Sequence, residues 1–174
     1  MITPTRTSLA ASDPRGFTLV ETLVAIAIIM IAIVGPYYSV QQAITASAIA
    51  RDQLIASSLA QEGAEYVYYR RDSNFLAGSS WLSGLSACQG TYGCTVDPSA
   101  NAVAACSSSG CAVLKLNTSN LYTYSGSYPA TKFTRTVKIQ TVSSTEVRVT
   151  VTVTWSTEHN SYTVDVVENL YNWL

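Results

Sequence analysis

The pattern of hydrophobic and polar positions begins with a long apolar run near the N-terminus. Between Phe17 and Tyr38 the only charged residue is Glu21, which lies close to the start of the run. About 20 residues, at a rise of roughly 1.5 Å each, match the roughly 30 Å hydrocarbon thickness of a bilayer. The pattern therefore predicts a transmembrane helix over residues 17–38, with one carboxylate near its first turn.

The helical pattern continues beyond this run. Gly35 and Pro36 should kink the helix or melt it locally, because proline lacks a backbone donor and clashes with the preceding turn. Residues 39–74 contain no proline and are predicted to form an amphipathic second half, helical to about residue 71. Gly63 weakens this half by roughly 1 kcal/mol relative to alanine without ending it. The predicted core-facing stripe consists of Ile44, Ala48, Ile55, Leu59 and Tyr66.

The rest of the chain changes from a helical to a strand period. Residues 75–131 are rich in Gly, Ser, Ala and Asn, and are predicted to be a loop with one small hairpin, residues 112–116 and 121–124. Residues 132–174 alternate apolar and polar positions in three strands with short turns, which predicts an antiparallel sheet. Its apolar positions are Phe133, Val137, Ile139, Val147, Val149, Val151, Val153, Trp155, Tyr162, Val164 and Val166. The expected fold class is α+β, with the amphipathic half of the helix covering the sheet.

Composition supports an anchored protein and excludes an electrostatic case for nucleic acid. The chain has 174 residues, which suits one domain plus an extra segment. Charged residues are only 12% and the net charge is −1, so no basic surface predicts binding to DNA or RNA. Nucleic acid is therefore not an expected partner.

Four cysteines, Cys88, Cys94, Cys106 and Cys111, lie within the loop segment. Their C-x5-C and C-x4-C spacings differ from the C-x2-C pairs of most zinc sites, and no histidine lies nearby. We expect no metal, no cofactor and two disulfides if the segment is exported. Three connectivities are possible, of which we favour Cys88–Cys94 with Cys106–Cys111. The alternative is four reduced thiols in a loop.

The basic residues predict the orientation of the anchor. Arg6 and Arg15 precede the apolar run, and the next basic residue is Arg51. The positive-inside rule then places the N-terminus in the cytoplasm and everything after Tyr38 outside. Gly16 is a small residue on the basic side of the run, so cleavage there would remove a leader, residues 1–16, and keep the membrane helix.

The residues Gly16-Phe17-Thr18-Leu19-Val20-Glu21, with the apolar residues 22–29, closely resemble the class III signal of type IV pilins and pseudopilins. The resemblance implies that a prepilin peptidase cuts after Gly16 and that the amine of Phe17 is N-methylated. It also implies an inner-membrane assembly platform as partner, and packing of the helix with other pilin or pseudopilin subunits in a filament. The long helix, the disulfide-bearing loop and the C-terminal sheet resemble the whole pilin fold.

The resemblance favours one position within the family. Major pilins commonly carry a disulfide near the C-terminus, whereas all four cysteines here precede Lys115. The apolar run and the C-terminal ending look more like a minor pilin or a pseudopilin of an initiating complex. A motility, secretion, DNA-uptake or adhesion filament would have the same anatomy.

Glu21 is the predicted assembly residue. An unpaired charge at membrane depth costs about 2.5–3.5 kcal/mol, so this carboxylate should have a partner. Cleavage after Gly16 would create one, the amine of Phe17, within the same helix or on a neighbouring subunit, where the pair would set the axial register. The competing interpretation is an acid favoured by the dipole at a helix N-terminus.

The sequence does not predict an enzyme. His159 lies in an expected hairpin turn without a nucleophile, and Asp97, Asp165 and Glu168 match no calcium-loop signature. The competing class is a single-pass anchored adhesin or binding protein that never polymerises. That class explains the apolar run but leaves the positions of Gly16 and Glu21 unexplained.

Overall fold

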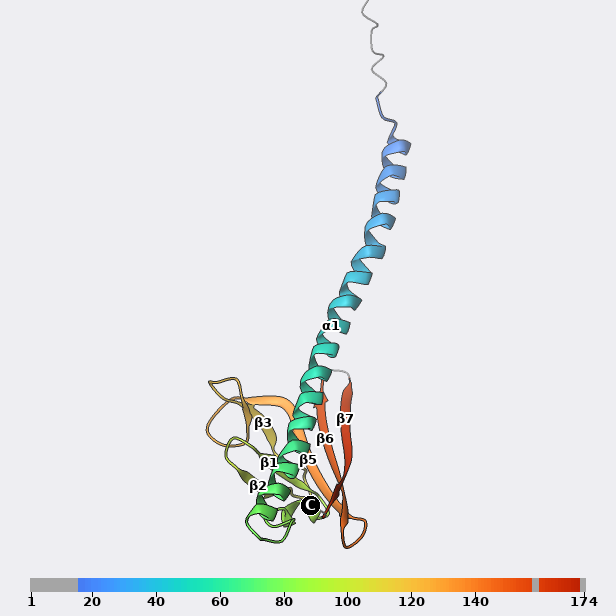
Figure 1. Ribbon diagram of the computed structural model, residues 1–174. Coiled ribbons are helices and arrows are strands. Elements are labelled where there is room, and N and C mark those ends of the chain that lie inside the picture. Colours follow the sequence, from blue (N-terminus) through green and yellow to red (C-terminus); the bar gives the residue numbers. More distant parts are fainter. Residues whose placement is uncertain (1–15, 158–159, 173–174) are drawn as a thin grey trace, which may run out of the picture. The chain divides into compact units, whose positions relative to one another are not determined.

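The computed structural model describes residues 16–157 and 160–172. The chain divides after Ser47 into two compact units. Helix α1 (Leu19–Leu76) contributes residues to both units. The strands all belong to the second unit, which we call the head (Figure 1). Each unit is described by itself.

In the first unit α1 is an exposed apolar helix. Every described residue from Gly16 to Ser47 is exposed, and a window of α1 reaches a mean hydropathy of 2.4, enough in length and composition to cross a membrane. Gly35 and Pro36 both lie inside α1, so the local melting allowed from the sequence is not found. Proline removes only one backbone N–H donor, and the neighbouring hydrogen bonds of the helix can remain. Membrane helices tolerate proline for this reason. The kink itself stays a prediction.

In the head, α1 packs on an antiparallel sheet through small side chains. Its buried residues include Ala56, Ala60, Gly63 and Ala64, together with the larger Leu59, Tyr66 and Val67. The predicted stripe is therefore right for Leu59 and Tyr66 and wrong at its start, because Ile44 is 60% exposed and Ala48 is also exposed. The first buried residue of α1 is Asp52, so Ile44 and Ala48 precede the part of the helix that packs on the sheet, and within that part the close approach is made mainly by alanine and glycine.

The sheet has seven strands. The sequence predicted five of them, namely three C-terminal strands and the two strands of a small hairpin. The seven strands are β1 (Cys94–Asp97), β2 (Ala102–Ala105), β3 (Val113–Leu116), β4 (Tyr122–Thr123), β5 (Ala130–Thr141), β6 (Glu146–Ser156) and β7 (Ser161–Tyr171). A short 3-10 helix, η1 (Ser86–Gln89), precedes β1. The small β3–β4 hairpin was expected, but β1 and β2 were assigned to loop, which is wrong. Each of these two strands has only four residues, and all four residues of β1 are buried, so neither shows an alternation of apolar and polar positions that the sequence could reveal.

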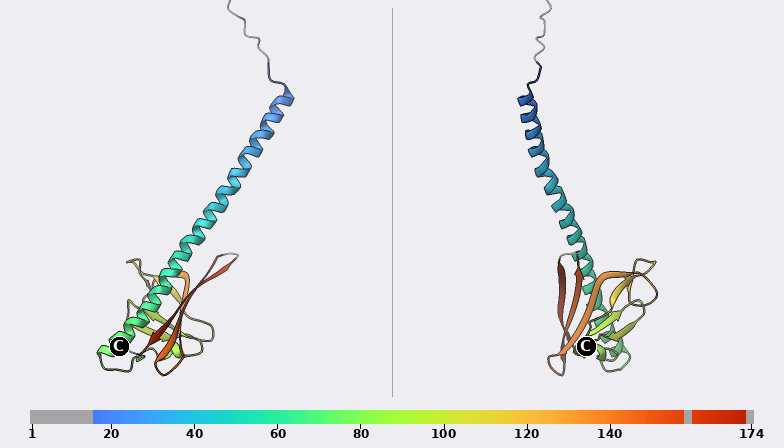
Figure 2. Two further views of the ribbon diagram at one scale, coloured as in Figure 1. Left: turned by 45° about the vertical axis from the view of Figure 1, so that its right-hand side comes forward. Right: turned by 180° about the vertical axis from the view of Figure 1, so that it is seen from behind.

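Strand β5 is the centre of the sheet (Figure 2). One edge pairs with β6, where Val137 lies opposite Val151, and β6 pairs in turn with β7. The other edge is shared by β1, at Cys94–Val137, and β3, at Val113–Thr134. The short strands within residues 75–131 and the C-terminal strands therefore form one sheet, whose apolar face is covered by α1.

Candidate functional site

The first site candidate is the stretch that leads into α1. Gly16, Phe17 and Thr18 precede the helix and are exposed, Phe17 by 81%. A Cβ placed on Gly16 would meet no atom within 4 Å. Folding of this chain therefore does not demand glycine at position 16, whereas a protease subsite could.

Thr18 caps the helix. Its hydroxyl accepts a hydrogen bond from the backbone N–H of Glu21 at 3.3 Å, and its carbonyl accepts one from the N–H of Thr22 at 3.1 Å. Thr-x-x-Glu is the sequence of a capping box, in which the threonine hydroxyl accepts a hydrogen bond from a backbone N–H of the first turn. The sequence analysis assigned Thr18 no role, although this spacing would have indicated one.

Glu21 lies in the first turn of α1 and is exposed. Its carboxylate has no hydrogen-bond or ion-pair partner among the residues that the structure describes. The helix dipole favours an acid here. Leu19, Val20, Leu23 and Val24 nearby are 52–75% exposed, and apolar surface of this extent needs lipid or other helices to cover it.

The second candidate region is the disulfide-bearing part of the head. Disulfides join Cys88 to Cys94 and Cys106 to Cys111, which is the local pairing favoured from the sequence. Cys88 and Cys94 are fully buried and tie η1 to the first residue of β1. Each bridge closes a loop of five or six residues, so the chain-entropy gain is about 2 kcal/mol.

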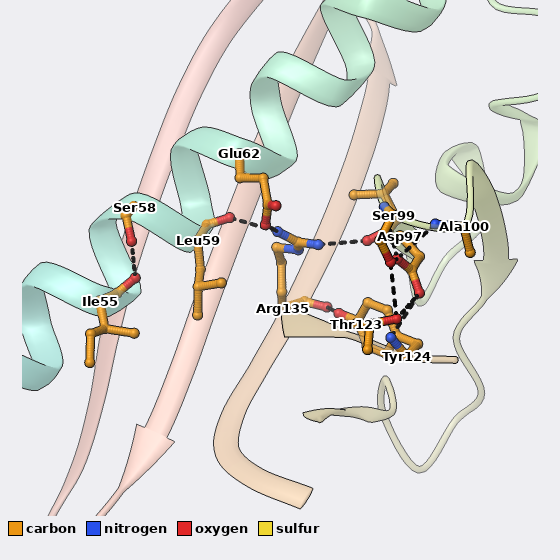
Figure 3. Close-up of polar contacts among 11 residues, drawn as sticks. Ile55, Ser58, Leu59, Glu62, Asp97, Ser99, Ala100, Thr123, Tyr124 and Arg135 are labelled. Atoms are coloured by element: carbon orange, nitrogen blue, oxygen red, sulfur yellow. Dashed lines mark hydrogen bonds and ion pairs between the residues drawn. The ribbon is translucent and has the colours of Figure 1, made fainter. Parts of the chain in front are cut away.

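Arg135 is the polar centre of the head. The side chain is fully buried between α1 and the sheet (Figure 3). One terminal nitrogen donates to the Glu62 carboxylate at 2.6 Å and to the Leu59 carbonyl at 3.0 Å, and the other donates to the Val96 carbonyl at 2.6 Å. A buried charge requires such partners, and here they come from both the helix and β1. The role of Arg135 is therefore to fix the helix to the sheet.

Asp97 is the second buried polar centre and holds two turns together (Figure 3). Oδ1 accepts from the hydroxyl and N–H of Ser99 and from the N–H of Ala100. Oδ2 accepts from the Thr123 hydroxyl at 2.7 Å and the Tyr124 N–H at 2.8 Å. Burial alone would raise the pKa of Asp97, but these hydrogen bonds outweigh it and lower the pKa to about 2.

The carboxylates considered for calcium do not form a site. The donors around Asp97 already occupy both of its oxygens, and Asp165 lies on β7 and accepts from the Thr152 hydroxyl. Glu168 is also on β7, which β6 and β5 separate from β1. Within residues 16–157 and 160–172 no group of three or more His, Cys, Asp or Glu residues could hold a metal. His159 lies outside the described residues.

Sequence reasoning missed both buried polar centres. Residue 135 falls between Phe133 and Val137 on the inward face of a predicted strand, so an arginine there was a readable signal for a buried charge. Asp97 followed by Pro98 and Ser99 has the composition of a turn that an aspartate caps. Its partners around Thr123 could not be found from the sequence, because they depend on the fold.

Comparison with known proteins identifies the N-terminal stretch. The family model described as "Prokaryotic N-terminal methylation motif" matches residues 12–35, which include Gly16, Phe17 and Glu21. Searches of curated proteins and of solved structures give no match to this chain. The motif supports a type IV pilin-like protein with pilin-type processing and assembly, and with the apolar helix it indicates membrane anchoring.

Proposed function

We propose that the chain is a structural subunit of a type IV pilus or a type II secretion pseudopilus. The observation that carries the proposal is the methylation motif at residues 12–35, which coincides with an exposed Gly16–Phe17 bond and an apolar helix. A prepilin peptidase cuts after Gly16, the new amine of Phe17 is methylated, and α1 then enters a filament through an inner-membrane assembly platform.

The chemistry of assembly follows from cleavage. The cut creates an amine at Phe17 that is protonated near neutral pH, four residues before Glu21. Methylation keeps its basicity. The Glu21 carboxylate pairs with the Phe17 amine of a neighbouring subunit, which offsets the cost of both charges in an apolar environment and fixes the axial position of the incoming helix.

Within such a filament we propose a minor or initiating position. The support is the placement of all four cysteines before Lys115, since major pilins commonly close a loop near the C-terminus. The head stands outside the cytoplasmic membrane, where its disulfides are stable.

Intact-mass analysis of the mature protein tests the processing step. We expect the mass to correspond to residues 17–174 plus one methyl group on the Phe17 amine. Gly16→Leu should keep the leader, because a bulky side chain crowds the protease subsite, whereas Thr5→Leu within the leader should be processed normally. A mature wild-type protein that begins at Met1 would overturn the proposal and leave a single-pass adhesin that does not polymerise.

A further inference from the structure

A hollow in the head lies between α1 and the turn that joins β1 to β2. It measures about 300 Å³ and is lined by Glu62, Glu65, Tyr66, Tyr69, Pro98 and Asn101. This is the lower end of the range of about 300–1,000 Å³ for ligand pockets, and is large enough to hold an arginine side chain. The rim is fixed in place, because the Tyr66 hydroxyl donates to Asn101 Oδ1 at 3.0 Å.

The residues that line the hollow favour a positively charged group. Two carboxylates and two tyrosine rings face it, and none of the lining residues is basic. Glu62 is already paired with the buried Arg135, whereas Glu65 is exposed and has no partner among the described residues. Arg70 donates a hydrogen bond to Asn101 and forms no ion pair with Glu65 among the described residues. A guanidinium could pair with Glu65 and stack on Tyr69, which is 59% exposed.

The same helix carries a matching cation outside the hollow. Arg51 is exposed and makes no hydrogen bond or ion pair within the part of the chain that the structure describes. At about 3.6 residues per turn, Arg51, Glu62, Glu65 and Tyr69 lie within about 60° of one another around the helix. Arg51 precedes Glu62 and Glu65 by 11 and 14 residues, or about 17–21 Å along the axis. Because of this distance, its side chain cannot reach the hollow of its own chain.

We propose that the hollow receives Arg51 of a second copy of this chain, packed parallel and displaced by about 20 Å along the helix. The contact is heterologous, since one copy gives the arginine and the other gives the hollow, and such contacts build open helical arrays rather than closed dimers. The inference rests on the proposed function and specifies a lateral contact within the filament. It requires that two copies of this chain lie next to each other in the filament.

Charge exchange in the full-length protein tests the contact. Arg51→Glu and Glu65→Arg should each lower the amount of chain in sheared filaments by about tenfold, the effect of losing about 1.4 kcal/mol. The double variant should recover most of the wild-type amount, since the pair is restored with reversed sign. Arg148→Glu is the control, because Arg148 is also an exposed arginine, lies on β6, and has no hydrogen bond or ion pair to any residue that the structure describes; it should leave the amount unchanged.

Photo-crosslinking gives a readout that does not depend on the amount of filament. A benzophenone amino acid in place of Leu54, which is 73% exposed and about 60° around the helix from Arg51, keeps the arginine and should crosslink to the peptide of a second copy that contains Tyr66 and Tyr69. The same group at Gln53, exposed and about 160° around the helix, should not. Crosslinks elsewhere, or no recovery in the double variant, would overturn the contact. A wild-type chain that is neither cleaved nor found in filaments would instead reject the proposed function.

Discussion

At the scale of single residues, Gly63 has a different effect on stability in the structure from the one that the sequence predicts. In the sequence it is a weak point in a helix, with a cost of roughly 1 kcal/mol relative to alanine. In the structure a Cβ at this position would lie 2.9 Å from Val151 Cγ1 and 3.1 Å from Arg135 Cδ. Val151 is stiff and fully buried, and hydrogen bonds hold Arg135, so neither can give way easily. Glycine is needed here for close approach of helix and sheet.

Gly63→Ala should therefore destabilise the head although alanine favours helix. Overpacking of about 1–3 kcal/mol exceeds the propensity gain, so we expect a net loss of about 1 kcal/mol in the free energy of unfolding. Urea unfolding of the detergent-solubilised protein measures it. Gly35→Ala is the matched control, since a Cβ there meets nothing within 4 Å. Equal or higher stability of Gly63→Ala would contradict the packing argument.

At the scale of elements, the sequence pattern predicted the helix, the long strands and the β3–β4 hairpin, but not the short strands β1 and β2. Strands β5 to β7 have 11 or 12 residues, enough for alternation to be read. Strands β1 and β2 have four residues each, and β1 is held by contacts with distant segments, namely the hydrogen bond from Arg135 to the Val96 carbonyl and the hydrogen bonds that Asp97 accepts from Thr123 and Tyr124. Such contacts between distant segments leave no local pattern. Short segments of the expected loop, residues 94–97 and 102–105, are therefore strands of the sheet.

The Asp97 network predicts how stability depends on pH. The pKa of Asp97 is lowered from 3.8 to about 2 in the folded state. The stabilisation of about 2 kcal/mol is present above pH 4 and is lost as the pH falls from about 4 to 2. Asp97→Asn should lack this contribution, so the difference in unfolding free energy between wild type and variant should shrink over that range. Parallel pH profiles would show that the carboxylate charge is not responsible.

At the scale of the whole molecule, the methylation motif was the most predictable part of the candidate site. Gly16, Phe17 and Glu21 are adjacent in sequence, so their chemistry needs no fold to bring them together. The hollow beside Glu65 could not be predicted, because Pro98 and Asn101 reach α1 only through the β1–β2 turn. The sequence thus predicts the steps at the N-terminus better than the contacts of the head.

Glu21→Ala tests assembly of the whole subunit. On the proposed function, the variant should still be cleaved after Gly16 and methylated, but its amount in sheared filaments should fall by at least about tenfold, since the proposed pair between Glu21 and the Phe17 amine is lost. Thr22→Ala is a nearby control, because the Thr22 hydroxyl bonds only to the Leu19 carbonyl among the described residues. Immunoblots of the sheared and membrane fractions give the ratio. Normal incorporation of Glu21→Ala would leave the helix-dipole explanation for this acid.

The placement of the two disulfides has a mechanical consequence. Both close loops of five or six residues between positions 88 and 111, and neither crosses from α1 to β5, β6 or β7. If a pulling force acts between α1 and the C-terminal strand, the covalent bridges remove only about ten residues from the length that can extend. Resistance to extension therefore comes from the hydrogen bonds of the β5–β6–β7 ladder and from the ties of Arg135, which can re-form after the load is released.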